Sequence, residues 1–301
     1  MKLAFLISTH TDVTQLKRLI EALPNNSVFF IHVDKKADLK PFTDAFIGDD
    51  RVVFIEHRVD VKWGSINEVE YQMELVRAAF DSKEKYDRLI TMSGMDYPLW
   101  NKERIVQFFE QDTQTEYLTA IDVSTPSKLS EIYREYFFLV SKPGHWRYPI
   151  NCFIRKALRL LGVRKPLKCK IADKTWKLYK GAAWWAITPQ LAKDILYEWD
   201  NNKELSKWLR YCMCSAELFA QTVAMNSEKW SERCLFYASG HDSLPKHTPL
   251  TYITWKNKEI KVLDIDDLDT LKSNDKMFCR KVITGKSDTL VNAIDRINKK
   301  G

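Results

Sequence analysis

Two stretches of the chain combine polar side chains with backbone features that suit a nucleotide. In HVDKK at 32–36, the imidazole of His32 and the carboxylate of Asp34 offer directional hydrogen bonds to a ribose or a base edge. Trp63, Gly64 and Ser65 offer a flat ring, a close backbone approach and a predicted helix amino end that suits an anion. The alternative roles are structural: a strand-end pair, and a buried ring before an ordinary cap.

Three other places carry carboxylates or aromatic rings with chemical potential. Asp96 lies in a predicted tight turn, where a carboxylate is either functional or a turn former. Gly181, Trp184 and Trp185 belong to KGAAWW, whose rings resemble a sugar-binding wall, although a tryptophan pair in a strand more often belongs to a core. Glu217 falls in the first turn of a predicted helix, where the macrodipole keeps a carboxylate ionised and helix capping is the alternative role.

Two cationic clusters near the carboxyl end of the chain flank an acidic turn. Lys258 belongs to the first cluster, and Arg280 and Lys281 belong to the second. Asp264 and Asp266 in the turn match the metal-binding pattern D-x-D, but they precede a predicted helix instead of following a strand. We therefore predict that these carboxylates begin a helix and that the chain has no metal site.

The elements that position these groups follow from the apolar pattern. Apolar runs at 2–8, 27–33, 51–55 and 87–92 alternate with amphipathic helical segments. Strands without polar alternation, separated by helices, indicate an α/β fold with a mostly parallel central sheet and helices on both faces. In such sheets the ligand lies beyond the carboxyl ends of the strands, where the HVDKK, WGS and SGMDYPL stretches fall.

Composition limits the class of protein. The 301 residues are 45% hydrophobic and 29% charged with a net charge of +7, which excludes disorder and coiled coil and invites an anionic partner. Phosphate-loop, dinucleotide and hydrolase-elbow motifs do not occur, and no nucleic-acid module accompanies the basic residues. Because there is no signal peptide, no membrane-length apolar run and no paired cysteine spacing, we expect a cytoplasmic protein with reduced thiols.

A basic stretch occupies 142–180, with Asp173 as its only acid. Between Ile150 and Leu161 the apolar residues recur at helical spacing, and Arg155, Lys156 and Arg159 fall on the opposite side. The plain interpretation is a surface helix docked on its own core. The alternative is peripheral contact with an anionic membrane, at its inner face.

Taken in order, six motifs resemble those of one family. HVDKK, VKWGS, SGMDYPL, KGAAWW, SAE and FCRK resemble successive motifs of family 14 of the glycosyltransferases, over about residues 3–282. That family contains the core-2/I-branching β-1,6-N-acetylglucosaminyltransferases and the peptide O-xylosyltransferases. The resemblance implies a GT-A type nucleotide-sugar transferase fold, inverting transfer from a UDP-sugar, and no metal or other cofactor.

The resemblance also implies roles for individual residues. Glu217 matches the catalytic base, and Lys281 matches a basic residue that binds the donor diphosphate, with Lys258 and Arg280 as further candidates. The uridine side would be held by His32, Asp34, Trp63, Gly64 and Ser65. The sugar or the acceptor would be contacted by Asp96, Gly181, Trp184, Trp185 and Arg134.

The resemblance therefore predicts a single domain over 1–301, with a nucleotide-binding half at about 1–120 and an acceptor-binding and catalytic half at about 121–301. We expect transfer of a sugar, most of all GlcNAc, from a UDP-sugar to a hydroxyl of a glycan or lipid-linked glycan. Ala216 and Ala182 depart from the family pattern, so xylose or another donor sugar is an alternative. Outside the family, the alternatives are a glycoside hydrolase with two facing carboxylates and a carbohydrate- or nucleotide-binding module without turnover.

Overall fold

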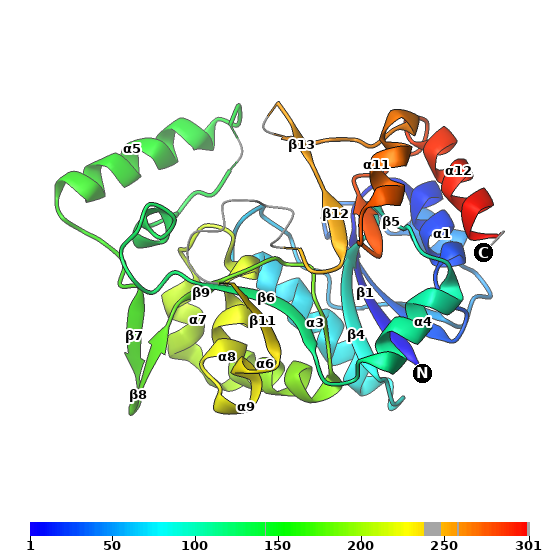
Figure 1. The fold of residues 1–301 in the computed structure, drawn as a ribbon. Helices are drawn as coiled ribbons and strands as arrows, with labels where there is room; N and C mark the ends of the chain where they lie inside the picture. Colours follow the sequence, from blue (N-terminus) through cyan, green and yellow to red (C-terminus); the bar gives the residue numbers. More distant parts are fainter. Residues whose placement is uncertain (142, 238–247, 258, 300–301) are drawn as a thin grey trace.

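A mostly parallel sheet forms the centre of the molecule (Figure 1). The computed structural model describes residues 1–141, 143–237, 248–257 and 259–299. Strand β1 lies between β2 and β4 and is parallel to both, and the strand order is β11-β6-β10-β4-β1-β2-β3, with β9 beside β6. The strands of this sheet are β1 (Leu3–Thr9), β2 (Ser27–Val33), β3 (Val52–Phe54), β4 (Arg88–Ser93), β6 (Glu116–Asp122), β9 (Tyr179–Lys180), β10 (Ala186–Ile187) and β11 (Cys234–Tyr237).

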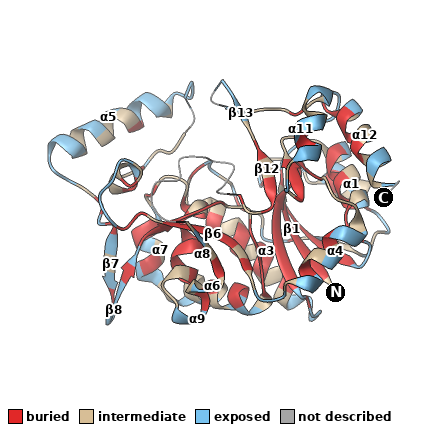
Figure 2. Cartoon of the chain, viewed as in Figure 1, coloured by how far each residue is buried: buried red, intermediate tan, exposed pale blue. Residues whose placement is uncertain are grey.

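The strand directions confirm the predicted α/β class. Strand β10 is antiparallel to both β4 and β6, so β4 and β6 run the same way, and β11 is parallel to β6. Among the described strands of this sheet, β9 and β10 alone run against the others. The apolar runs of the sequence form β1, β2 and β4 because both faces of the sheet are buried (Figure 2).

Helices cover both faces, as the alternation along β1 shows. Ala4 and Leu6 pack in one core with residues of α3, α6 and α8, whereas Phe5 and Ile7 pack in a second core with residues of α1, α2 and α4. The α-helices are α1 (Val13–Ala22), α2 (Lys40–Ala45), α3 (Asn67–Asp81), α4 (Lys102–Gln111), α5 (Arg147–Leu160), α6 (Pro189–Asn201), α7 (Lys203–Leu209), α8 (Phe219–Met225), α9 (Glu228–Ser231), α11 (Leu268–Ser273) and α12 (Asp288–Asn298). No helix of the described ranges is both long and apolar enough to cross a membrane.

A smaller sheet joins segments that are far apart in the sequence. It contains β12 (Thr251–Ile253), β15 (Phe278–Arg280) and β5 (Asp96–Pro98), and the antiparallel pairing of β15 with β5 sets Arg280 opposite Asp96. A third core, which includes Tyr97 and Cys279, packs below α11 and α12. The remaining strands form the hairpins β7 (Lys168–Ile171) with β8 (Lys174–Lys177) and β13 (Trp255–Lys256) with β14 (Glu259–Ile260).

Two predicted helix starts near the site differ from the structure. The predicted helix around Glu217 is divided into a 3₁₀ turn, Ser215–Glu217, and α8, because Leu218 between them has a φ of −122°. Helix α3 begins at Asn67, so Ser65 lies in the turn before it. The predicted helix start at Asp264 is confirmed: its side chain accepts the N–H of Asp266 at 3.1 Å, at a 3₁₀ turn that leads into α11.

Candidate active site

Charged side chains gather beyond the carboxyl ends of β1, β2 and β4. Strand β2 continues the sheet on one side of β1 and β4 on the other, so this edge is the switch point where α/β sheets bind ligands. His10 follows β1, and partial burial lowers its pKa. The charges of Lys281, Arg280 and Lys36 lower this pKa further, whereas Asp34 raises it. These four groups therefore lie close enough to His10 to act on it electrostatically. The sequence had not singled out His10.

The HVDKK stretch is held by internal bonds. The ring of His32 is 1% exposed, stacks on Tyr71 with 5.1 Å between ring centroids, and accepts the N–H of Val59 on Nε2 at 2.9 Å. Burial lowers the pKa of His32 to about 4, so the ring is neutral at pH 7. His32 is thus held within the fold, and its contact with a nucleotide stays a prediction. Asp34 lies directly after the end of β2 and is 9% exposed. Its carboxylate lies 3.2 Å from Lys36 Nζ.

Asp96 and Arg280 form a buried ion pair. Asp96 is 0% exposed, and its Oδ1 accepts Arg280 Nη1 at 3.0 Å while its Oδ2 accepts the N–H of Ser93 at 2.8 Å. The guanidinium carbon of Arg280 lies 5.0 Å from the centroid of the Trp184 ring. Burial raises the pKa of Asp96, and the charge of Arg280 opposes that rise. The structure therefore brings Arg280, which was predicted at the donor diphosphate, together with Asp96 and Trp184, which were both predicted at the sugar or acceptor.

Glu217 is more exposed than the other two candidate carboxylates, Asp34 and Asp96. Its side chain is 31% exposed, and Lys180 Nζ lies 3.2 Å from Glu217 Oε2. The N–H of Gly181 donates to the carbonyl of Glu217 at 2.8 Å. A Cβ at Gly181 would lie 1.9 Å from the carbonyl oxygen of Thr119 in β6, so only glycine lets the chain after β9 pass this close to β6. The sequence reasoning missed Lys180, although it is the first residue of KGAAWW.

The WGS stretch contacts the turn that carries Glu217. The carbonyl of Gly64 accepts the N–H of Cys214 at 2.8 Å, and a Cβ on Gly64 would lie 2.9 Å from Val140. Ser65 bonds within its own turn, to the carbonyl of Lys62 at 2.7 Å. These contacts attach the start of α3 to the Glu217 turn.

The remaining candidates have varied positions. Trp185 is 2% exposed and packs in the core with α3 and α6, which is the alternative that the sequence gave for this ring, while Trp184 is partly exposed. Arg134 pairs locally with Glu131 at 2.9 Å. Lys258 lies outside the described residues.

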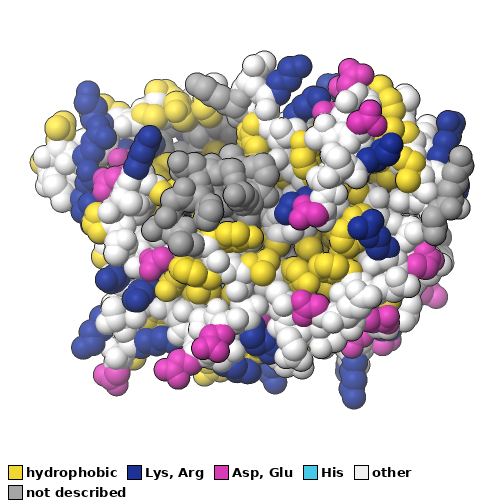
Figure 3. Space-filling view, in the orientation of Figure 1, with side chains coloured by type: hydrophobic (Ala, Val, Ile, Leu, Met, Phe, Trp, Pro, Cys, Tyr) yellow, Lys and Arg dark blue, Asp and Glu magenta, His cyan; other side chains and the backbone are white. Residues whose placement is uncertain are grey.

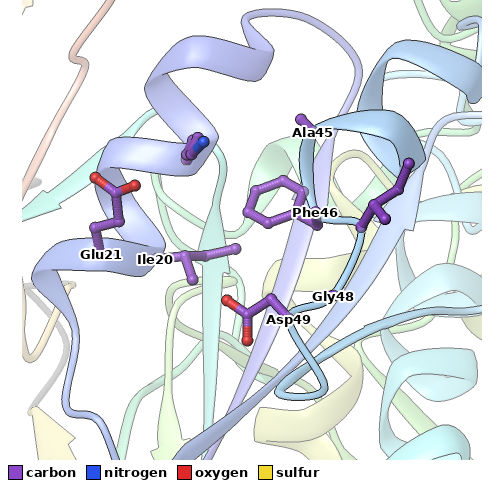
Figure 4. Close-up of a pocket in the computed structure, with 8 residues that line it drawn as sticks. Ile20, Glu21, Ala45, Phe46, Gly48 and Asp49 are labelled. Carbon is purple, nitrogen blue, oxygen red and sulfur yellow. The ribbon is translucent and has the colours of Figure 1, made fainter.

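A separate pocket lies between the second half of α1 and residues 45–49, and it is lined by Ile20, Glu21, Phe46 and Asp49 among others (Figure 4). Residues 45–49 precede β3, so this pocket lies toward the amino end of that strand. It contains none of the candidate site residues.

A mostly parallel sheet with a partly exposed carboxylate and clustered cations beyond its strand ends is the arrangement in which α/β proteins bind ligands. The chain belongs to the Core-2/I-Branching enzyme family, whose model matches residues 3–267, and it is a glycosyltransferase. The family resemblance and the GT-A type of the fold are thereby confirmed.

Solved structures are similar at a low level. TarS from S. aureus is 11% identical with a TM-score of 0.36, and the match covers 80% of this chain and 36% of TarS, so the chain spans only about a third of that protein. A mannose-1-phosphate geranyltransferase from Thermus thermophilus is 12% identical with a TM-score of 0.34, over 91% of this chain and 80% of that chain. No curated protein matches the sequence.

Proposed function

We propose that the chain is an inverting glycosyltransferase that moves GlcNAc from a UDP-sugar to a hydroxyl of a glycan or lipid-linked glycan, forming a β-linkage. The observation that carries the proposal is Glu217, whose 31% exposed carboxylate lies 3.2 Å from Lys180 Nζ and whose main-chain carbonyl accepts the N–H of Gly181. Single-displacement transfer needs one such carboxylate as its base. Xylose and other UDP-linked sugars are the alternative donors.

In the proposed reaction, Glu217 accepts the proton of the acceptor hydroxyl. The hydroxyl oxygen attacks the anomeric carbon on the side opposite to the diphosphate, and the bond from that carbon to the diphosphate oxygen breaks. UDP leaves with the electron pair, so the anomeric configuration inverts in one step. Lys281 stabilises the charge that develops on the diphosphate, and Lys258 is a further candidate for this role. Arg280 contributes mainly through Asp96, because its guanidinium is already bonded there.

Metal independence is part of the proposal. Asp264 and Asp266 form one of the two D-x-D patterns of the sequence, the other being Asp267 and Asp269, and Asp264 is engaged in capping a 3₁₀ turn. A fixed cation can provide the charge stabilisation for which many such enzymes use a divalent metal. Lys281, with Lys258 as a further candidate, would then stabilise the charge on the departing diphosphate in place of a metal ion.

The proposal extends to the place of the enzyme in the cell, the cytoplasm at the inner membrane face. All six cysteines are unpaired, and Cys212, Cys234 and Cys279 are buried. Unpaired buried thiols are typical of a reducing compartment. A lipid-linked acceptor would be available at that membrane.

The test is a panel of UDP-GlcNAc, UDP-xylose, UDP-glucose and UDP-glucuronate, measured first for hydrolysis and then with candidate acceptors in the presence of EDTA. We expect one donor to be turned over and the product to carry a β-linkage, read from its anomeric proton coupling. Binding of UDP without turnover of any donor would favour the non-catalytic binding module. Cleavage of a glycan without a nucleotide would favour the hydrolase.

A further inference from the structure

Helix α5 presents a row of large apolar side chains to solvent. Trp146, Phe153, Leu160 and Leu161 are 66%, 73%, 78% and 76% exposed, and Ile150 between them is 41% exposed. The spacing of these residues places them on one side of the helix, along about 22 Å of its axis. Figure 1 shows α5 at the upper left, apart from the central sheet. A surface helix ordinarily turns such a row toward its own core.

The opposite side of α5 is fastened to the protein by polar contacts. Arg155 donates to Glu135 at 2.6 Å and lies 4.2 Å from the centroid of the Phe137 ring. Asn151, 4% exposed, accepts the N–H of Leu139 at 3.4 Å. The expectation of a helix docked on the core by its apolar side, with Arg155 outward, is therefore wrong. Glu135 attracts Arg155 inward, and this leaves Phe153 and Leu161 outside.

Cations flank the apolar row. Lys156 is exposed, Arg147 lies 5.0 Å from the centroid of the Trp146 ring, and the Arg159 side chain is 55% exposed. Glu131 and Glu135 beside this surface are shared among four arginines, including Arg159, whose Nη1 lies 3.9 Å from Glu135 Oε1, so an excess of positive charge remains. Figure 3 shows hydrophobic side chains beside Lys and Arg at the upper left, over α5. The exposed part of this surface thus combines apolar groups with uncompensated positive charge.

We infer that α5, with Trp146 and Leu161 at its ends, is an interfacial helix that lies in the headgroup region of an anionic lipid bilayer. The apolar row would enter the boundary between headgroups and acyl chains, and Lys156 and Arg159 would contact lipid phosphates. The cations favour an anionic bilayer over a second copy of this chain, because two copies of the same basic surface would repel each other.

The segment before α5 connects this surface to the candidate active site. The N–H of Phe137 donates to the carbonyl of Tyr211 at 2.9 Å, and Val140 packs against Gly64, which bonds to Cys214. A bilayer against the apolar row of α5 would therefore be linked to the Glu217 turn through residues 137–140, and it could present a lipid-linked acceptor. This last step rests on the proposed function, whereas the membrane contact does not.

The experiment is flotation of the full chain with phosphatidylcholine vesicles, with or without phosphatidylglycerol, at low and high salt. We expect flotation with phosphatidylglycerol, little without it, and less at high salt because salt screens surface charge. Phe153→Ser combined with Leu160→Ser should lower the partition coefficient at least about 30-fold, since two side chains no longer enter the bilayer. Lys156→Gln should lower it about 5-fold. Ile47→Ser is the matched control, because Ile47 is 83% exposed outside α5 and should not change binding.

Failure of the wild-type chain to float with anionic vesicles would overturn the inference. Sedimentation of the wild type as a dimer and of the Phe153→Ser, Leu160→Ser variant as a monomer would also overturn it, because the apolar row would then be an interface between two copies of the chain. Circular dichroism verifies that the variants are folded. No sugar donor is present in the flotation, so the result is independent of whether the proposed transfer is correct.

Discussion

Asp96 and Glu217 are both carboxylates held by a cation, but their surroundings differ. Asp96 is completely buried and bonded to Arg280 and to the N–H of Ser93, whereas the Glu217 side chain is 31% exposed beside Lys180. A proton acceptor must reach the substrate, and a buried ion pair cannot. The comparison therefore separates a buried carboxylate that joins strands β5 and β15 from a partly exposed one that a substrate could reach.

The largest expected effect is a loss of stability when buried Asp96 is changed. Asp96→Asn keeps the shape of the side chain but leaves the buried Arg280 charge uncompensated, so the free energy of unfolding should fall by about 3–5 kcal/mol. Urea denaturation measures this loss. Asp269→Asn, at a side chain that is 96% exposed, is the control and should change it by less than about 0.5 kcal/mol. A fully stable Asp96→Asn protein would refute the structural role given to Asp96.

The second largest effect is a loss of turnover when the more accessible carboxylate, Glu217, is changed. Glu217→Gln removes proton acceptance while keeping the shape, so turnover should fall at least about 100-fold with unchanged UDP affinity. Because the group is partly exposed, the free energy of unfolding should change by less than about 1 kcal/mol. Steady-state kinetics and UDP titration measure both, with Asp269→Asn again as a lysine-paired control. Near-normal turnover of Glu217→Gln would mean that another group is the base.

His32 is buried like Asp96, and its burial should make the stability of the fold depend on pH. Its pKa is lowered to about 4 in the fold, against about 6.5 in the unfolded chain, so the unfolded chain binds a proton first on acidification. Stability from this group is complete above about pH 6.5 and is lost toward pH 4, which amounts to about 2 kcal/mol between pH 7 and pH 5. Urea midpoints at both pH values should show this loss in the wild type and a smaller one in His32→Gln. Equal losses in the two proteins would contradict it.

The smallest effect concerns Asp264, a partly exposed carboxylate that is already engaged in a hydrogen bond. Asp264→Asn keeps an acceptor for the N–H of Asp266, so turnover should change less than about 2-fold, and EDTA should leave it unchanged. Donor turnover with and without EDTA or added Mn²⁺ gives the answer. If EDTA abolished turnover and added Mn²⁺ restored it, the metal-independent mechanism would be wrong. Asp264 would then be a candidate metal ligand.

The sequence predicted the parallel sheet because its strands are buried on both faces and therefore read as continuous apolar runs. It could not predict that His32 and Trp185 are buried, since strand-end and strand residues have the same local pattern in either case. The Asp96–Arg280 bond joins residues that are 184 positions apart, and no local signal reports it. For α5, periodicity identified two sides, but the side that faces the protein depends on Glu135, which lies outside the helix.

The pairing of β5 with β15 also bears on the order in which the protein is made. Asp96 is synthesised in the first third of the chain, and its partner Arg280 is added near the end. Domains fold as they emerge from the ribosome, and contacts of long sequence separation form late. The parallel strands β1 to β4 can therefore assemble during translation, while β5 has no partner strand until β15 has emerged. A nascent chain halted before residue 278 would contain most of the central sheet and still lack the Asp96–Arg280 bond.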